Sequence, residues 1–277
     1  MSASHIHRGP EHAVAEEGSF AASTSDLPVL QYYPCRGRAE PIRNMLVLSY
    51  VGQPWFEPPL ESIRKIQSIM RREFDGYPFR RGRGLSRLPR FIDGAHGEVD
   101  LVQSGAILRH LGRTYDLYGK DLVQAGRVDM LLDAAAELRA KLRELVVDAG
   151  LAESACVAYG ESVLAGEEVL RGSGMQGPGL ASLEYPLARQ RYSSSGWLVG
   201  EAPSLADFAV FDLVDLHLGL FPDLVGGRFP ALAAHHAKVA ALPGVAEYLA
   251  SDSRHPAAWA VQWIKGEETH GSAQSGA

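Results

Sequence analysis

The apolar pattern changes character near residue 119, and this change restricts the fold more than any other feature of the sequence. Before it, short β-prone runs alternate with helical spacing and with turn signals. Beyond Gly119 the apolar residues keep helical spacing, and no strand-like alternation competes with it. The sequence therefore predicts an α/β part followed by an all-helical part, with the boundary near Tyr118–Leu122.

The first part is predicted to run strand, helix, strand, helix, strand, strand, helix, which is a βαβ unit followed by a hairpin. The ranges are Val29–Tyr33, Ala39–Val51, Trp55–Glu57, Glu61–Phe74, Leu88–Ile92, Glu98–Val102 and Ser104–Tyr115. The second part is predicted to hold one long helix through Val128–Val146 and several shorter ones. These are Ala152–Arg171, Leu183–Tyr192, Ser204–Leu220, Pro230–Leu242 and Val245–Ala250. We expect domains at 27–117 and 122–265, a disordered extension at 1–26 and a flexible tail at 266–277.

The composition argues against several classes of protein. A net charge of -6 over 277 residues argues against general affinity for nucleic acid or acidic membranes. The apolar runs fall short of the ~20 residues that a membrane span needs, and the first 26 residues lack the apolar core of a secretory signal. Cys35 and Cys156 are too few for a disulfide framework, so a reducing, cytoplasmic location is expected.

The stretch QYYPCRGRAEPIR, from Gln31 to Arg43, leaves a predicted strand and enters a predicted helix. It offers two rival chemical groups, Tyr32 and Cys35. A neutral phenol stays protonated near neutral pH and can donate a hydrogen bond. A thiol close to a helix N-terminus can instead ionise and act as a nucleophile itself. The two groups therefore imply different reactions.

Three shorter motifs lie where predicted elements begin. Ser204 and Asp207 form a capping-box pattern ahead of an apolar run, which indicates the start of a core helix. The pair Gln103-Ser104 opens another helix; its commoner role is an N-cap, and the alternative is a carboxylate site at the helix amides. The Leu88–Pro89 bond is expected to be trans on sequence alone, whereas a cis bond would turn the Leu88 backbone toward an extended ligand.

Four segments together resemble a known family. The stretches YYPCRGRAEPIR, LPRF, LVQSGAILRHLGRTYDLYGKD and SLADFAVFDLVDLHLGLF occur in the order and spacing of a cytosolic glutathione transferase. The resemblance covers roughly Leu27 to Arg254 and is closest to the tyrosine-type pi and sigma classes. It implies an α/β thioredoxin-like N-terminal domain with a mixed four-stranded sheet, an all-α C-terminal domain and a homodimer. It also implies glutathione as co-substrate, hydrophobic electrophiles as second substrates in xenobiotic detoxification, and no metal.

The resemblance also implies roles for particular residues. Tyr32 matches the catalytic tyrosine, and Arg38 matches an arginine near the glutathione carboxylates. The residue before the proline in Leu88–Pro89 matches one whose backbone pairs with the cysteinyl unit of glutathione across a cis-proline. Gln103 and Ser104 match the pair that holds the γ-glutamyl end.

Further positions concern the partner subunit and the second substrate. Glu137 falls at the position of a helix carboxylate, usually Asp, that reaches the glutathione of the partner subunit. Tyr33, Cys35, Arg143 and Val147 fall at or near positions of the electrophile pocket.

The segment before Leu88 departs from the pi pattern. The loop at 71–84 is longer than usual, so the contacts to the glycyl carboxylate are not assigned, and Arg87 stands where the pattern has Gln. Leu85 aligns near the aromatic residue that locks the pi dimer. The segment is also basic, which is typical of a solvated face or, alternatively, of a mouth that attracts a small anion.

A glutathione thiol should titrate near ~8.5, and holding it ionised at neutral pH requires lowering that pKa by about two units, or ~2.7 kcal/mol. A hydrogen bond to a charged acceptor contributes roughly 1.5–3 kcal/mol, so the Tyr32 phenol alone is nearly sufficient. The thiolate then attacks an electrophilic carbon. On this hypothesis Cys35 lines the electrophile pocket.

Three alternatives stay open at this stage. A sigma-like member would be a glutathione-dependent prostaglandin isomerase that uses the same thiolate. A thiol transferase based on Cys35 would reduce mixed disulfides. A non-enzymatic ligand-binding or structural protein would use the same fold without chemistry.

Overall fold

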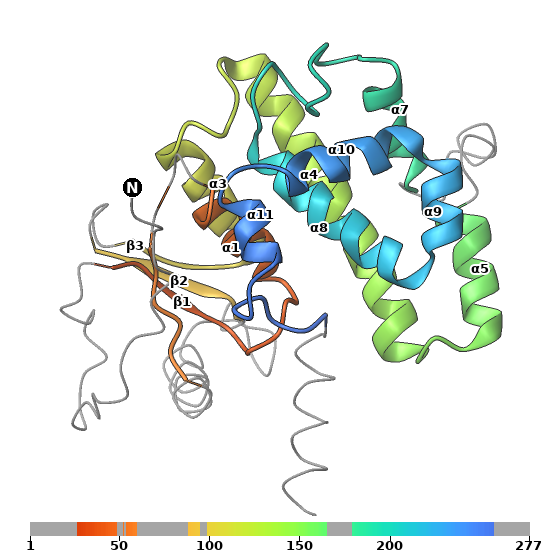
Figure 1. The fold of residues 1–277 in the computed structure, drawn as a ribbon, viewed down its shortest axis with the longest axis horizontal. Helices are drawn as coiled ribbons and strands as arrows, with labels where there is room; N and C mark the ends of the chain where they lie inside the picture. The colour runs from red at the N-terminus through yellow and green to blue at the C-terminus, as the bar shows by residue number, and fades with distance from the viewer. Residues whose placement is uncertain are drawn as a thin grey trace, which may run out of the picture.

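The computed structural model describes residues 27–48, 52, 54–59, 88–94, 99–164 and 179–257, and the structural statements below concern these residues. Figure 1 shows a small sheet with α1 and α3 on one side of the molecule and a larger group of helices on the other. The predicted helix Glu61–Phe74, the basic segment and both predicted flexible ends lie outside the described residues.

The described sheet has three antiparallel strands in the order β1-β2-β3: β1 is Val29–Gln31, β2 is Arg90–Asp93 and β3 is Val99–Val102. Each is shorter than its predicted range. The predicted strand Trp55–Glu57 is reduced to a single parallel bridge between Phe56 and Val29. Phe56 therefore pairs in parallel with β1 at this one position. Leu30 N donates to Phe56 O at 2.9 Å, and Phe56 N donates to Pro28 O at 2.9 Å.

Two helices accompany the sheet. Helix α1 is Glu40–Leu46, with Pro41 in its first turn, where a missing N–H costs no helical hydrogen bond. It was predicted to reach Val51, but it ends at Leu46 and Gly52 N closes a further turn on Leu48 O. Helix α3 is Ser104–Thr114, which agrees with its predicted range to within one residue.

The rest of the described chain is helical. Its elements are α4 Leu122–Arg143, the π-helical turn η2 Glu144–Asp148, α5 Glu153–Val163, α7 Ala181–Ala188, α8 Leu205–Leu220, α9 Pro222–Arg228, α10 Pro230–Ala240 and α11 Val245–Leu249. Helix α9 was not predicted, since PDLVGGR has two glycines and little apolar periodicity. The predicted helix Ala152–Arg171 is described only to Val163–Leu164, because 165–178 lie outside the described residues.

Helix α8 lies at the centre of the core. It contacts α1 and α3 of the first part and α4, α9 and α10 of the second, and Figure 1 shows it within the helical group beside α4. Its first ten residues, Leu205 to Val214, are all buried, as expected of a helix that is covered on every side. The buried cluster is continuous from Leu30 of β1 to Val245 of α11, so the two parts share one core.

The last turns of α8 contain a buried polar pair. The His217 Nδ1–H donates to the Leu213 carbonyl at 2.7 Å, and its Nε2 then accepts from the Tyr159 hydroxyl at 2.6 Å. Burial lowers the pKa of His217 to about 4, and the nearby positive charge of Arg139 adds to this. His217 is therefore neutral at neutral pH, which fits its role as a hydrogen-bonded core residue. In the described part of the chain, no helix combines the length and apolarity that crossing a membrane requires.

Candidate functional site

The register of the sheet brings three predicted site segments to one end. Gln31 of β1 pairs with Arg90 of β2, and Arg90 pairs with Val102 of β3. Tyr32 follows Gln31, and Gln103 follows Val102, in strands that both run opposite to β2. The Leu88–Pro89 peptide ends just before Arg90, so it lies at the same end of the sheet. Segments that are far apart in sequence therefore converge on one edge.

The Tyr32 ring is buried, and its hydroxyl oxygen accepts one hydrogen bond from the protein. Its side chain is 5% exposed and meets the ring of Tyr33 edge-on, with centroids 6.1 Å apart. The hydroxyl oxygen accepts a hydrogen bond from the Arg38 backbone N–H at 3.0 Å. Burial is the main cause that raises the pKa of Tyr32 above its ordinary value, and it outweighs the Arg38 hydrogen bond. The phenol thus keeps its proton, which it can donate to a bound anion.

Gly37 makes room for the Tyr32 ring. It has a φ of +40°, in the left-handed region that glycine adopts most readily. A Cβ at this position would lie 2.3 Å from the Tyr32 hydroxyl oxygen and 2.8 Å from a ring carbon. The turn and the phenol therefore fit together only when residue 37 has no side chain.

Arg139 of the helical part also fixes the turn at Gly37. Arg139 of α4 donates to the Gly37 carbonyl at 3.2 Å and to the Asp212 carboxylate of α8. Burial is the main cause that lowers the pKa of Arg139 to about 10, and the positive charge of Arg38 adds to it. Arg139 still carries its charge near neutral pH. Arg139 and Asp212 were not predicted as site residues, since a pair 73 residues apart has no local signature in the sequence.

The Leu88–Pro89 peptide bond is cis. The expectation of a trans bond from sequence alone was therefore wrong, whereas the cis bond implied by the family resemblance is confirmed. The trans preference of an X–Pro bond amounts to only about 0.5–1 kcal/mol, so tertiary contacts decide it rather than the two residues themselves. Pro89 is buried and Leu88 is half-buried, beside the end of β1.

The start of α3 differs from an ordinary cap. Gln103 occupies the N-cap position with φ 76° and ψ 113°, an unusual conformation for a residue other than glycine. Among the described residues, its side chain makes no capping hydrogen bond with the helix. Ser104 is already the first helical residue, and Ala106 gives the first turn no acidic side chain. The commoner N-cap role is thus not seen, and the amides of this turn can receive a carboxylate.

Three of the other predicted residues lie on α4 and η2. Glu137 is exposed on the surface of α4. Arg143 pairs with Asp148 at 2.7 Å, a contact that the wider π turn between them allows. Val147 lies on that turn and is half-buried. In the described part of the chain, none of these three residues is hydrogen-bonded to Tyr32, so their roles in glutathione and electrophile binding stay predictions.

Cys35 is fully buried, with 0% of its surface exposed. Burial is the main cause that raises the pKa of its thiol to about 12, although Arg43 opposes this. A protonated thiol without solvent access is a poor nucleophile. The geometry therefore favours Tyr32 over Cys35 as the reactive group of this stretch, while the place of Cys35 in an electrophile pocket stays a prediction.

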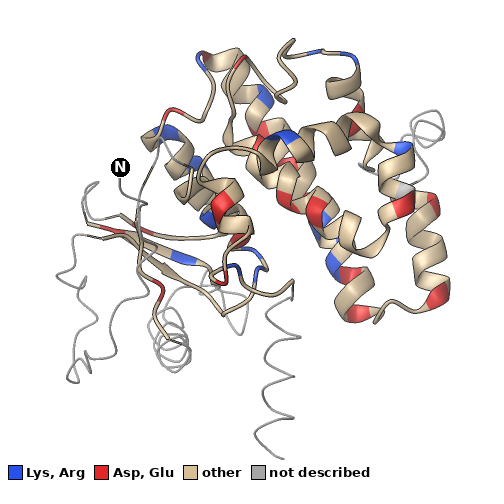
Figure 2. Ribbon diagram, in the orientation of Figure 1, with Lys and Arg blue, Asp and Glu red and all other residues tan. Residues whose placement is uncertain are grey.

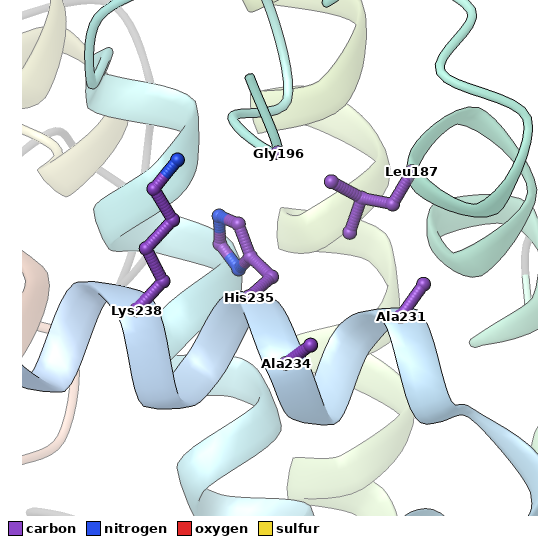
Figure 3. Close-up of a pocket in the computed structure, with 6 residues that line it drawn as sticks. All are labelled: Leu187, Gly196, Ala231, Ala234, His235 and Lys238. Atoms are coloured by element: carbon purple, nitrogen blue, oxygen red, sulfur yellow. The ribbon is translucent and has the colours of Figure 1, made fainter. Parts of the chain in front are cut away.

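A separate cavity lies in the helical part. It has a volume of about 210 Å³ and is bordered by Leu187, Gly196, Ala231, Ala234, His235 and Lys238 (Figure 3). Lys238 is already engaged, because its ammonium donates to the Ser195 carbonyl and lies 3.8 Å from the centre of the Trp197 ring. None of the predicted site residues in the described chain borders this cavity. The described residues also contain no group of three or more His, Cys, Asp or Glu suited to a metal ion.

Comparison with known proteins agrees with this geometry. The family described as "Glutathione S-transferase, C-terminal domain" matches residues 180–252. Glutathione S-transferase P of Bos taurus is 32% identical over 220 residues, which are 79% of this chain and 90% of that protein. A glutathione S-transferase of Dirofilaria immitis is 31% identical over 80% of this chain and 91% of its own length. The solved structure of the pi-class glutathione S-transferase of Onchocerca volvulus is 29% identical and covers 80% of this chain and 91% of its own, with a TM-score of 0.62. The chain therefore belongs to the cytosolic glutathione transferase superfamily and is pi-like.

Proposed function

We propose that this protein is a glutathione transferase that joins the thiolate of glutathione to hydrophobic electrophiles, with Tyr32 as the residue that activates the thiol. The observation that carries the proposal is the convergence of Tyr32, the cis Leu88–Pro89 bond and the open start of α3 on one end of the sheet. The named relatives, all glutathione S-transferases, support the same activity.

Two of the three units of glutathione have a candidate partner at this edge. The Leu88 backbone pairs with the cysteinyl unit, and Gln103 with Ser104 receives the γ-glutamyl carboxylate at the amides of α3. Arg38 is exposed next to Tyr32 and supplies positive charge for a carboxylate. This arrangement leaves the thiol facing the Tyr32 hydroxyl, whose own proton is free to donate because its oxygen accepts from Arg38 N.

The reaction follows from that hydrogen bond. The thiol proton leaves to solvent, and the Tyr32 O–H stabilises the sulfur anion by roughly 1.5–3 kcal/mol, close to the ~2.7 kcal/mol needed to lower its pKa by two units. The sulfur lone pair then forms a C–S bond with the electrophilic carbon. In a substitution the leaving group departs with its bonding electrons, and in an addition the neighbouring carbon takes a proton from solvent.

The variant Tyr32→Phe tests the assignment of the phenol. It should raise the apparent pKa of the bound thiol by about two units and lower turnover near neutral pH by about 10- to 100-fold. Conjugation to a model aromatic halide measures turnover, and thiolate absorbance measures the pKa. The matched control is Tyr185→Phe, which removes the same hydroxyl from a surface tyrosine that is 40% exposed. Full activity of Tyr32→Phe near neutral pH would remove the phenol from the mechanism.

We further propose a homodimer that uses the exposed face of α4. Val123 and Met130 are 61% and 49% exposed, and Glu137 follows at the same spacing of seven residues. Residues seven apart lie on one side of a helix, so this apolar stripe leads directly to Glu137. A partner that covers the stripe would bring Glu137 to the neighbouring site. Sedimentation that finds a monomer would remove the dimer, and unchanged glutathione affinity in Glu137→Ala would remove the shared site alone.

We also propose that the protein works in a reducing compartment, with the cytoplasm as the first candidate. Cys35 and Cys156 are both free thiols, which suits such a location. Fractionation of cells that make the native chain tests this, and recovery in an oxidising compartment would contradict it. The Cys35 thiol transferase is disfavoured by the burial of that thiol, and no observation favours the isomerase or the non-enzymatic alternative.

A further inference from the structure

One carboxylate of α8 gathers two arginines and a histidine from three different segments. Asp215 accepts from Arg36 of the loop before α1 at 2.6 Å and from Arg254 of the C-terminal segment at 2.7 Å. The His236 ring of α10 lies 3.0 Å from its second oxygen. The side chains of Asp215, Arg36 and Arg254 are only 14–21% exposed, so water screens these contacts weakly. We name this set the Asp215 cluster.

A second carboxylate joins the same segments. Glu40, at the start of α1 and fully buried, accepts from Arg254 at 3.2 Å and from the Tyr248 hydroxyl of α11 at 3.1 Å. The Arg36 N–H donates to the Pro256 carbonyl at 3.1 Å. The segment after α11 is therefore bound to the α/β part through backbone and side chains, and Figure 2 shows charges of both signs close together near α1 and α11.

These contacts act on the turn that holds the Tyr32 hydroxyl. The Arg36 carbonyl accepts from the amides of Ala39 and Glu40, at 3.1 and 3.0 Å, and so starts α1. Arg36 is thus fixed by its N–H, its carbonyl and its guanidinium. Two residues later, the Arg38 N–H donates to the Tyr32 oxygen. A displacement of Arg36 would move that amide, and the phenol would turn with it.

The charges around Asp215 explain why its loss would move Arg36. Burial raises the pKa of Asp215, but His236, Arg254 and Arg36 together hold it well below its usual range, so the carboxylate stays ionised near neutral pH. Without this charge, Arg36 and Arg254 would face each other across a poorly solvated site, with Glu40 as the remaining acid for Arg254. The next carboxylate along α8, Asp212, is already bound by Arg139. Repulsion would therefore push Arg36 outward.

We propose that Asp215 is a positioning residue for thiol activation, which acts through Arg36 on the turn that orients Tyr32. The proposal rests on the role of Tyr32 proposed above. It assigns a function in the N-terminal site to a residue of the helical part that never touches the substrate. Arg254 of the C-terminal segment binds the same Asp215 oxygen and also Glu40.

The test compares Asp215→Asn with Asp223→Asn, the same change at an exposed carboxylate in the first turn of α9. Asp215→Asn should lower kcat/KM for conjugation by about 10-fold at a pH one unit below the thiol pKa, and it should raise that pKa by about one unit, because one pH unit is a factor of ten in ionisation. The loss should shrink to less than about 2-fold above both pKa values, where the thiol ionises without help. Asp215→Glu should recover part of the activity, and Asp223→Asn should match the unchanged protein.

The pH profile separates positioning from a purely structural role. An equal loss at every pH, with an unshifted thiolate titration, would overturn the proposal, and so would full activity of Asp215→Asn. If Asp215→Asn does not fold, as judged by its unfolding midpoint, Arg36→Gln breaks the Arg36–Asp215 ion pair from its other side and must show the same pH-dependent loss. Combining Asp215→Asn with Tyr32→Phe gives no further pKa shift if Asp215 acts through the phenol. A fully active Tyr32→Phe protein would instead refute the proposed activation itself, which keeps the two failures apart.

Discussion

Helices α3 and α8 both begin beside a serine, yet their N-termini differ. We call the start of α8 closed, because side chains of the chain itself cap it, and the start of α3 open, because it has no side-chain cap in the described residues. At the start of α8, the Asp207 carboxylate accepts from Ser204 N at 2.7 Å, Ser204 Oγ at 2.8 Å and Leu198 N at 2.9 Å, and it lies 2.8 Å from His235 Nε2. At the start of α3, the corresponding third helical position is Ala106, and the Gln103 side chain makes no capping bond in the described chain.

The difference shows which feature separates a structural helix start from a binding one. Ser104 and Ser204 alone do not distinguish them. The third helical residue does, because the Asp207 carboxylate accepts the N-cap amide of Ser204 from within the chain, whereas Ala106 offers no acceptor at that place and leaves the start of α3 to an outside anion. The closed start supports the core, and the open start is the proposed site of the γ-glutamyl carboxylate.

The largest expected effect is a loss of stability on changing Asp207 at the closed start of α8. Asp207→Ala removes a fully buried carboxylate and leaves the Leu198 and Ser204 amides and His235 without it. We expect the free energy of unfolding to fall by about 3–5 kcal/mol. Chemical denaturation measures this, with Asp223→Ala at the exposed first turn of α9 as the control. A loss as small as that of the control would mean that the α8 start is not closed by Asp207.

A fall in pH should destabilise the fold at the opposite end of α8, where His217 is buried. In the unfolded chain His217 takes a proton below its ordinary pKa of 6.5, but the folded chain resists this until about 4. The unfolded state therefore binds more protons in this window, and stability falls by up to about 1.4 kcal/mol per pH unit as the pH drops. Above 6.5 the effect vanishes. His217→Gln should flatten this part of the stability-against-pH curve, and an unchanged slope would contradict the burial argument.

The open start should show its effect in binding rather than in stability. Ser104→Ala should weaken glutathione binding by about 10-fold, the value of one hydrogen bond to a carboxylate. The free energy of unfolding should change by less than about 0.5 kcal/mol. Calorimetric titration measures the affinity, with Ser182→Ala near the start of α7 as the control. If stability fell and affinity did not, α3 would be a structural start like α8.

The smallest effect comes from closing the open start. Ala106 is exposed at the position equivalent to Asp207, so Ala106→Asp places a carboxylate where α8 has one. We expect about 0.3–1 kcal/mol of added stability without ligand, and a weaker affinity for glutathione because the new negative charge repels the γ-glutamyl carboxylate at this helix start. Ala106→Asn tests whether charge or shape is responsible. Tighter glutathione binding in Ala106→Asp would contradict the proposal that the start of α3 binds a carboxylate of glutathione.

The fold class was predicted from the sequence and is confirmed, because helical and strand periodicities are local signals that burial reinforces. The starts of α8, α10 and α11 also agree with prediction, since capping residues and prolines act within one turn. Helix ends agreed less well. α1 stops before its predicted end, and α4 passes into a π turn at Glu144.

The candidate site likewise has features that were predicted from the sequence and features that were not. The family resemblance predicted roles for Tyr32, Gln103 and Ser104, which stay predictions, and implied the cis bond at Leu88–Pro89, which the structure has. The positive φ of Gln103 and the contacts of Arg139 with Gly37 could not be predicted, because they depend on segments that meet only in the folded chain. The same is true of Asp215, which looks like an ordinary polar residue on a helix until Arg36 and Arg254 are seen around it.

The contact between Gly37 and Tyr32 has a consequence for how such a chain can diverge. Any side chain at position 37 would begin 2.3 Å from the phenol oxygen, so the two positions cannot vary independently. A lineage that keeps the phenol must keep glycine five residues later. A lineage that exchanges the phenol for a smaller nucleophile or hydroxyl removes the steric clash, although the φ of +40° still favours glycine at position 37. A change at position 37 can therefore only follow the loss of the tyrosine.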